Sequence, residues 1–216
     1  MEIIEQYWEW IRKPKMPLQL IELAGRTCYK SEDKITKDSA VQFVKNIIAR
    51  GHESVIEHVV ASVKFVTDRG VTHELVRHRI ASFSQESTRY CNYGSDDIKF
   101  IRPVWCEIPL CKITSEIECN RFGLNPYSAE FKWMFSMLNA EADYKNLLQL
   151  GWRPEQARSV LPNSLKTEIV MTANVREWRH VFKLRTSKAA HPQIRELMIS
   201  CLEGFKQEIP VIFDDL

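Results

Sequence analysis

Two stretches of the chain alternate between apolar and polar positions, which is the period of a half-buried β-strand. The first covers residues 59–67, where Val59, Ala61, Val63 and Phe65 would form one face. In the second, residues 165–175, one face would carry Leu165, Thr167, Ile169, Met171, Ala173 and Val175. We therefore predict one strand in each stretch.

Apolar residues recur at helical spacing in six other segments, and prolines or glycines lie near several of their ends. The predicted helices cover residues 17–29, 38–50, 126–150, 154–161, 176–185 and the segment from Pro192 onward. Asp38 is expected to cap the second helix, and Gly51 follows its end. Cys28 and Cys201 lie on apolar faces of the first and last helices, so we expect both in the core.

Between the first strand and residue 126 the pattern is weaker. A helix is expected after Gly70 that carries Glu74, Arg77 and His78, followed by a polar loop with the sequence IASFSQESTRY. Residues 105–125 contain Pro109, Gly123 and three cysteines and read as an insertion or long loop. Because helices and strands mix without regular alternation, we predict an α+β fold. It would be one domain over residues 1–216, with a mixed or antiparallel sheet packed against helices.

Composition excludes several classes of protein. The chain has 216 residues, 44% hydrophobic and 27% charged, which is typical of a globular domain. The net charge of only +2 is too small to attract the whole protein to nucleic acid or to acidic membranes, so neither partner is expected. The first ten residues are acidic and aromatic and lack the basic start and apolar core of a secretory signal, so none is expected, and no apolar run reaches the roughly 18 residues that a membrane helix needs. Six cysteines without a CxxC pair indicate reduced thiols in the cytoplasm. The spacing of Cys106, Cys111 and Cys119 does not fit structural zinc, so no metal is expected.

The most unusual segment is Arg77-His78-Arg79, followed after seven residues by Ser87 and then by Arg89. Three consecutive side chains cannot share one helix face, and their divergence suits an extended polyanionic ligand. Arginine supplies a planar fork of donors that matches phosphate oxygens. Two alternatives are a solvated basic patch and an RNA-binding surface, since aromatic residues that could stack on bases lie nearby: Phe83, Tyr90 and Tyr93. The near-neutral net charge argues against the RNA-binding surface.

This segment, with its Arg-Tyr ending at 89–90, resembles the signature of the flavin-dependent thymidylate synthases. Further blocks that resemble the same family follow in order: GHESVIEH at 51–58, ARSVLP at 157–162, NVR at 174–176, a helix ending Leu184-Arg185, and AHPQIR at 190–195. The resemblance covers roughly residues 24–205. Because several ordered blocks agree, it is far more specific than a lone RHR.

The resemblance implies reductive methylation of dUMP to dTMP. The carbon donor would be 5,10-methylenetetrahydrofolate, and FAD reduced by NADPH would supply hydride. A homotetramer would share each active site between several subunits. The implied FAD-binding residues are Ser54, Glu57, Arg77, His78, Arg79, Gln85, Asn174, Val175, Arg176, His180, Leu184 and His191. The implied dUMP-binding residues are Glu74, Arg77, Gln85, Glu86, Ser87, Thr88, Arg89, Arg158 and Arg185.

Arg185 and His52 are the implied catalytic residues, with His52 near the flavin and folate. Carbon 5 of uracil becomes nucleophilic only when negative charge can build on the ring, and a fixed guanidinium at Arg185 would stabilise that charge. Ser87 is expected to hydrogen-bond the nucleotide, because no triad partner is evident for it. Glu74 stands where the family often has Gln. The alternative functions are another flavoprotein activity on the same scaffold, or a nucleic-acid-binding module.

Overall fold

The computed structural model describes the chain apart from the side chains of residues 120 and 121. Its strands are β1 (Glu2–Ile4), β2 (Tyr7–Arg12), β3 (Val60–Asp68), β4 (Ser82–Gln85), β5 (Lys99–Ile101) and β6 (Lys166–Asn174). Its α-helices are α1 (Pro17–Thr27), α2 (Ser39–Ala49), α3 (Arg69–Leu75), α4 (Glu116–Arg121), α5 (Ala129–Gln149), α6 (Pro154–Ala157), α7 (Val175–Arg185) and α8 (Pro192–Glu208). Short 3₁₀ helices cover Glu32–Lys34, Glu53–His58 and Arg158–Val160. This mixture of helices and strands confirms the α+β class.

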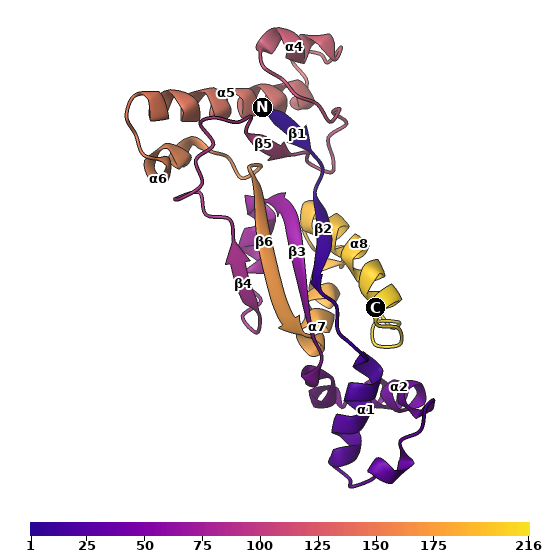
Figure 1. The fold of residues 1–216 in the computed structure, drawn as a ribbon. Coiled ribbons are helices and arrows are strands. Elements are labelled where there is room, and N and C mark those ends of the chain that lie inside the picture. Colours follow the sequence, from indigo (N-terminus) through magenta and orange to yellow (C-terminus); the bar gives the residue numbers. More distant parts are fainter. The chain divides into compact units, whose positions relative to one another are not determined.

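The strands form a four-stranded sheet in the order β2-β3-β6-β4 and a separate parallel pair, β1 and β5 (Figure 1). The arrows of β3 and β6 point in opposite directions, so these two central strands are antiparallel (Figure 1). The alternation expected for the second strand is confirmed, because the predicted inner face is buried along its whole length: Leu165, Thr167, Ile169, Met171, Ala173 and Val175. In β3 the predicted inner face is likewise buried at Ala61, Val63 and Phe65, and Ser62 and Val66 of the other face are buried as well.

The chain divides into two compact units. The first comprises residues 1–7, 65–75 and 85–169. Its core packs around α5, whose buried residues include Met134 and Tyr144. Ser128 caps this helix, since its Oγ accepts a hydrogen bond from the backbone N–H of Phe131 at 3.2 Å. The buried carboxylate of Glu141 accepts hydrogen bonds from the backbone N–H of Ile98 at 2.8 Å and from Lys145 Nζ at 2.9 Å, which offsets the cost of burying it.

The second unit comprises residues 8–64, 76–84 and 170–216. Its core is an aromatic cluster in which α7 packs against α8. The ring of Phe205 lies 4.8 Å from that of Trp178, 5.0 Å from that of Phe182 and 5.3 Å from that of Phe213, centroid to centroid. These spacings are those of favourable edge or tilted aromatic pairs. The cluster fixes the position of α7, which carries the site described below.

Several local predictions were wrong. Helix α3 ends at Leu75, so Arg77 and His78 follow the helix instead of lying on it. Residues 82–85 of the expected polar loop form strand β4. Helix α1 ends at Thr27, which leaves Cys28 exposed, whereas Cys201 is buried as expected. Asp38 stands at the N-cap of α2 but makes no side-chain capping hydrogen bond.

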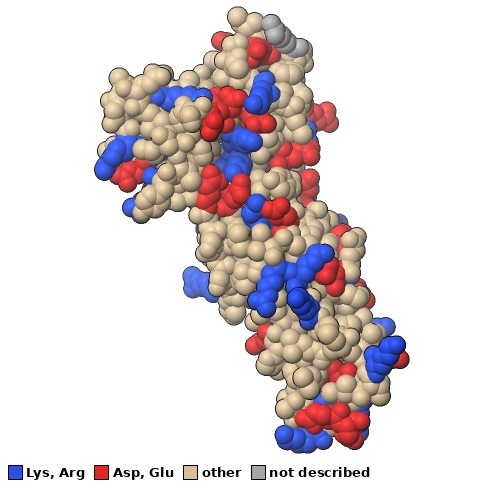
Figure 2. Space-filling view, viewed as in Figure 1, with Lys and Arg blue, Asp and Glu red and all other residues tan. Residues whose placement is uncertain are grey.

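The stretch 105–125 contains the short helix α4 (Glu116–Arg121) within otherwise irregular backbone. That this stretch is an insertion stays a prediction. The surface shown in Figure 2 carries Lys and Arg side chains close to Asp and Glu side chains, as the small net charge would suggest. Among the described residues, no helix has the length and apolar character that a membrane crossing requires.

Candidate active site

The junction between β6 and α7 positions the first group of functional side chains. Asn174 is the N-cap of α7, and its side chain accepts a hydrogen bond from the backbone N–H of Glu177 at 2.9 Å. Such a cap satisfies a donor that the first helical turn leaves unpaired. The capped turn therefore holds Glu177, and His180 three residues later, on neighbouring positions of one helix face.

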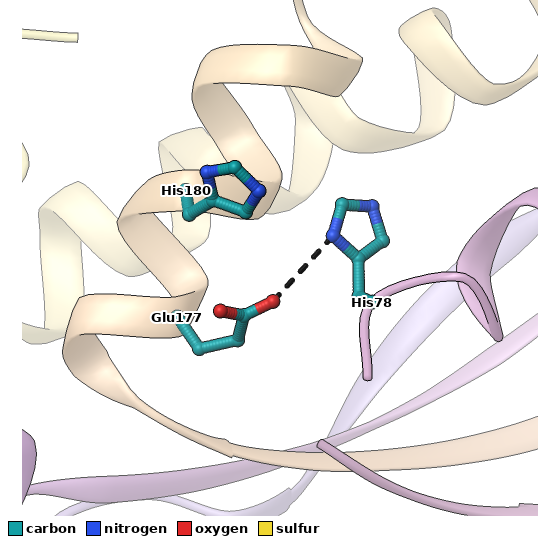
Figure 3. Close-up of side chains that lie close together, drawn as sticks. All are labelled: His78, Glu177 and His180. Carbon is teal, nitrogen blue, oxygen red and sulfur yellow. Dashed lines mark ion pairs between the residues drawn. The ribbon is translucent and has the colours of Figure 1, made fainter. Parts of the chain in front are cut away.

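His78, from the turn after α3, lies against this face of α7 (Figure 3). Its side chain is buried, with 4% of the residue exposed. Its Nε2 accepts a hydrogen bond from Nε of Arg185 at 3.0 Å, and its Nδ1 lies 3.5 Å from a carboxylate oxygen of Glu177. The imidazole of His180 meets that of His78 edge to face at 5.8 Å between centroids.

Burial, which is the largest cause, and the nearby charges of Arg185 and His180 together lower the pKa of His78 from 6.5 to about 4. The imidazole is therefore neutral near pH 7, which agrees with Nε2 acting as a hydrogen-bond acceptor. Burial raises the pKa of Glu177, and His180 partly opposes that rise. A neutral imidazole thus separates a buried carboxyl group from a permanent guanidinium.

His78, Glu177 and His180 are also residue types that bind transition metals, and their ligand atoms lie within 4.8 Å of one another. The guanidinium of Arg185, however, already donates to His78 Nε2 and places a fixed positive charge beside the group. A cation would be repelled by that charge. The expectation of no metal stays a prediction, and this geometry supports it.

A cavity of about 500 Å³ opens beside these residues, within the range of cofactor sites. It is lined by Glu53, Glu57, Ile80, Asn174, Arg176, Glu177, Arg179, His180 and Lys183. Arg176 Nη1 lies 2.6 Å from an oxygen of Glu57 and Arg176 Nε 3.5 Å from Glu53. The wall therefore combines cations, carboxylates and an amide.

Arg179 is the buried cation of this wall. Its two terminal nitrogens each donate to a separate oxygen of Asp215 at 2.7 Å, and Nη1 also donates to the carbonyl of Ile212. Its Nε is buried and makes no hydrogen bond within the described part of the chain, although Glu53 lies 3.6 Å away. An unused buried donor is costly and is a natural contact for a ligand.

A second cavity, of about 470 Å³, lies in the first unit. It is lined by Arg69, His73, Thr88, Glu155, Arg158, Ser159, Leu161 and Leu165. Arg158 Nη1 donates to the hydroxyl of Thr88 at 3.0 Å, which holds the guanidinium in the cavity wall. The Nη1 atom of Arg69 is buried and donates no hydrogen bond to any described residue. Two guanidinium groups in one cavity suit a phosphate.

The chain around β4 is held by polar contacts that fix its path beside this cavity. The amide of Gln85 donates to the hydroxyls of Thr72 at 3.0 Å and Thr167 at 3.3 Å. Glu86 accepts from Lys166 at 3.1 Å and from the Tyr93 hydroxyl at 2.8 Å. These contacts anchor the residues that lead to Ser87 and Thr88.

Comparison with known proteins identifies the family of this chain. The family model described as thymidylate synthase complementing protein matches residues 9–211. The chain is 35% identical to a flavin-dependent thymidylate synthase from Corynebacterium efficiens over 206 residues, which cover 91% of this chain and 78% of the relative. A relative of the same name from Mycobacterium tuberculosis is 37% identical over 205 residues, with the same shares covered. This chain belongs to the flavin-dependent thymidylate synthases.

A solved structure agrees on the fold. Thymidylate synthase X from Helicobacter pylori, determined with FAD and dUMP, matches with a TM-score of 0.76 at 23% identity, over 97% of this chain and 98% of that one. The resemblance inferred from the sequence motifs is thereby confirmed at the level of family and fold.

The structure distributes the residues expected from the flavin-dependent thymidylate synthase motifs between the two units. All of the expected flavin-binding residues except Gln85 belong to the second unit, and Glu57, Asn174, Arg176 and His180 line its cavity. Val175 is fully buried, so its side chain faces the core. His191 caps α8, since its Nδ1 accepts from the backbone N–H of Gln193 at 3.3 Å.

The residues expected to bind the nucleotide belong to the first unit, with the exception of Arg77 and Arg185. Thr88 and Arg158 meet in its cavity, while Arg89 lies over the ring of Tyr90 at 5.3 Å. His52, the second expected catalytic residue, is exposed at the start of the 3₁₀ helix Glu53–His58. The assigned roles stay predictions at this stage.

No role was expected for several residues that line the two cavities: Glu53, Arg69, His73, Glu177, Arg179 and Lys183. For part of this set a sequence signal existed. Glu177, His180 and Lys183 follow one another at intervals of three after Asn174, which places them along one side of the helix. No comparable signal marks Arg69, because the second cavity is assembled by tertiary packing.

Proposed function

We propose that this chain converts dUMP to dTMP by reductive methylation, with 5,10-methylenetetrahydrofolate as carbon donor and NADPH-reduced FAD as hydride source. It would act in the cytoplasm as a homotetramer whose active sites draw on several subunits. The observation that carries the proposal is the hydrogen bond between His78 and Arg185, at 3.0 Å and 107 residues apart in the chain. Two separate motifs of the family meet there, beside a cavity large enough for a cofactor.

The residues of the second unit fit FAD. Arg176 and Lys183 would supply positive charge for the pyrophosphate, and the unused Nε of Arg179 would supply a buried donor. Glu57 and Asn174 offer acceptors for hydroxyl groups, and Ile80 offers an apolar surface in the same wall. When bound, the reduced flavin supplies the hydride that completes the methyl group.

The first unit fits the phosphate of dUMP. Arg158 would bind the phosphate with its planar fork, while the hydroxyl of Thr88 holds one of its nitrogens. Ser87, next in the chain to Thr88, would contribute a hydroxyl hydrogen bond to the nucleotide. Glu74 would contact the nucleotide as well.

Arg185 would act on the uracil ring. A guanidinium can only donate hydrogen bonds and carries a positive charge, so it would stabilise negative charge on the ring without moving a proton. His78 orients this guanidinium through Nε2 and, being neutral, adds no competing charge. The chain thus supplies a fixed positive charge where negative charge develops in the transition state.

The test is dTMP formation coupled to NADPH oxidation, together with release of tritium from dUMP labelled at carbon 5. We expect the purified protein to show a flavin absorption spectrum and to be active in both assays. Arg185→Ala should lose most turnover while keeping most of its bound FAD, whereas the exposed Arg50→Ala serves as the control for loss of one arginine. A flavoprotein that binds dUMP but releases no tritium would contradict the proposal.

The shared site has its own test. At a dUMP concentration well below the dissociation constant of Arg158→Leu, the Arg158→Leu and Arg185→Ala proteins should each show little turnover alone. They should regain part of the activity when their subunits are mixed and exchanged. Light scattering should give the mass of four chains. A monomer with full activity would refute the shared site but not the reaction.

A further inference from the structure

Glu177 has no role in the family motifs, yet it is the buried carboxyl group nearest to His78. Its position is fixed by the capped first turn of α7, where its own backbone N–H is bound to Asn174. Its side chain points toward His78, which comes from a different segment of the chain (Figure 3). The contact therefore connects the RHR turn to the helix that carries Arg185.

The hydrogen bond from Arg185 indicates where the proton of His78 lies in the structure. A guanidinium can only donate, so the Nε2 that it contacts at 3.0 Å must be the nitrogen without a proton. A neutral imidazole then carries its proton on Nδ1, the nitrogen that faces the Glu177 carboxylate at 3.5 Å. Arg185 and Glu177 thus favour the same tautomer of His78, since Arg185 requires an acceptor at Nε2 and Glu177 attracts a donor at Nδ1.

We propose that Glu177 is a positioning residue for catalysis: its carboxylate holds the Nδ1–H of His78, so that Nε2 faces Arg185 and fixes its guanidinium. This inference rests on the proposed function for the role of Arg185. Without the carboxylate, His78 can move its proton to Nε2, which would then meet the N–H of Arg185 as two opposing donors. The hydrogen bond would be lost and the guanidinium would leave its position.

Glu177 also lines the cavity proposed for FAD, so a direct contact with the cofactor is the competing role. The two roles predict different losses. A positioning residue lowers kcat when both FAD and dUMP are saturating, because misplacing a transition-state contact by about 1 Å can cost about 100-fold. A flavin ligand instead weakens FAD binding and leaves kcat of the loaded enzyme nearly intact.

The experiment compares Glu177→Leu, which removes the acceptor, with Glu177→Gln, which keeps an acceptor of similar shape. We expect Glu177→Leu to lower kcat about 10- to 100-fold with the dissociation constant of FAD changed less than about threefold, and Glu177→Gln to recover most of the turnover. Lys183→Leu is the contrast on the same helix and cavity, and we expect it to weaken FAD binding mainly.

Nitrogen-15 NMR of the labelled histidines reports which ring nitrogen of His78 carries the proton. A purely structural role of Glu177 would leave this tautomer unchanged. The His78 resonances are identified by their loss in His78→Gln. We expect the Nδ1–H tautomer in the wild type, in Glu177→Gln and in Lys183→Leu, and a shift toward Nε2–H in Glu177→Leu.

An unchanged tautomer in Glu177→Leu, an unchanged kcat, or a loss of FAD affinity as large as the loss of kcat would each overturn the proposal. If Glu177→Leu does not fold, Glu177→Met provides the same comparison. Absence of dTMP formation in the wild type would refute the proposed function alone, because the tautomer measurement still tests the contact between Glu177 and His78.

Discussion

Replacing Arg158 by leucine tests the proposed phosphate site most directly. The leucine keeps an apolar stem of similar width but removes the cationic fork. In the structure one nitrogen of Arg158 is held by the Thr88 hydroxyl at 3.0 Å, and the guanidinium lies in a wall shared with Arg69. The neighbouring contacts therefore position the fork before the nucleotide arrives, and the substitution should remove binding energy without reorganising the cavity.

The expected magnitude follows from the type of contact. A hydrogen bond to a charged group contributes about 1.5–3 kcal/mol, which corresponds to roughly a 10- to 150-fold change in affinity. Arg158 is half-buried, so solvent screening places the effect toward the lower end of that range. We expect the dissociation constant of dUMP to rise about 10- to 50-fold in Arg158→Leu, with Arg158→Lys between it and the wild type.

The assay compares two ligands on two proteins. Titration calorimetry with dUMP and with deoxyuridine, which lacks the phosphate, should show the loss for dUMP only. Thr88→Val is the matched control, since it removes the supporting hydroxyl but no charge, and we expect only a few-fold change. Equal losses for dUMP and deoxyuridine would refute the assignment of Arg158 to the phosphate, because the arginine would then act on the base, the sugar or the fold.

Three further predictions concern stability and reactivity. The pKa of His78 is lowered from 6.5 to about 4 in the folded state, so between these pH values the unfolded chain binds a proton that the folded chain does not, and the free energy of unfolding should fall as the pH decreases from 6.5 to 4. In urea titrations, His78→Gln should remove up to about 3 kcal/mol of this loss, and an unchanged dependence of the free energy of unfolding on pH would contradict the shift. A Cβ at Gly204 would overlap the ring of Trp8, so Gly204→Ala should lower the melting temperature, because an overpacking cost of about 1–3 kcal/mol exceeds the gain in helix propensity of about 1 kcal/mol. Glu203→Ala, at an exposed position of the same helix, is the control, and a higher melting temperature for Gly204→Ala would show that the Trp8 ring moves aside freely. Cys28 should react with a thiol reagent in the native protein while Cys201, whose pKa burial raises, reacts only after unfolding, and mass spectrometry of the labelled peptides checks the order.

The elements that the sequence predicted well are those whose pattern arises from burial alone. Strand β6 alternates because one face packs on the core, and Trp178 and Phe182 of α7 are buried at the expected helical spacing. Strand β4 was missed because three of its four residues are polar and none of the four is buried, and its identity depends on pairing with β6. Strand pairing of this kind depends on tertiary contacts, so the local strand propensity of four residues does not predict it.

The candidate site divides in the same way. Ordered motifs were enough to indicate that His78, Arg158 and Arg185 serve a ligand, because unusual residues at fixed spacing are visible in a sequence. The sequence could not show that His78 contacts Arg185 directly, since α3 was expected to run past Leu75 and would have carried His78 on its own face. Arg69 depends on packing between segments and carries no motif of its own. The spacing along the helix places Glu177 near His180 but does not reveal its contact with His78.

Helix α7 connects the hydrophobic core of the second unit to Arg185. One side of the helix is fixed in the aromatic core by Trp178 and Phe182, and another side forms the cavity wall through His180 and Lys183. Because both sides belong to one rigid element, core packing sets the height and rotation of every cavity side chain on it. Arg185 lies in the last turn of α7, and the hydrogen bond to His78 restrains its side chain there. Hydrophobic packing thus positions the helix, and the hydrogen bond to the buried, neutral His78 then orients the Arg185 side chain.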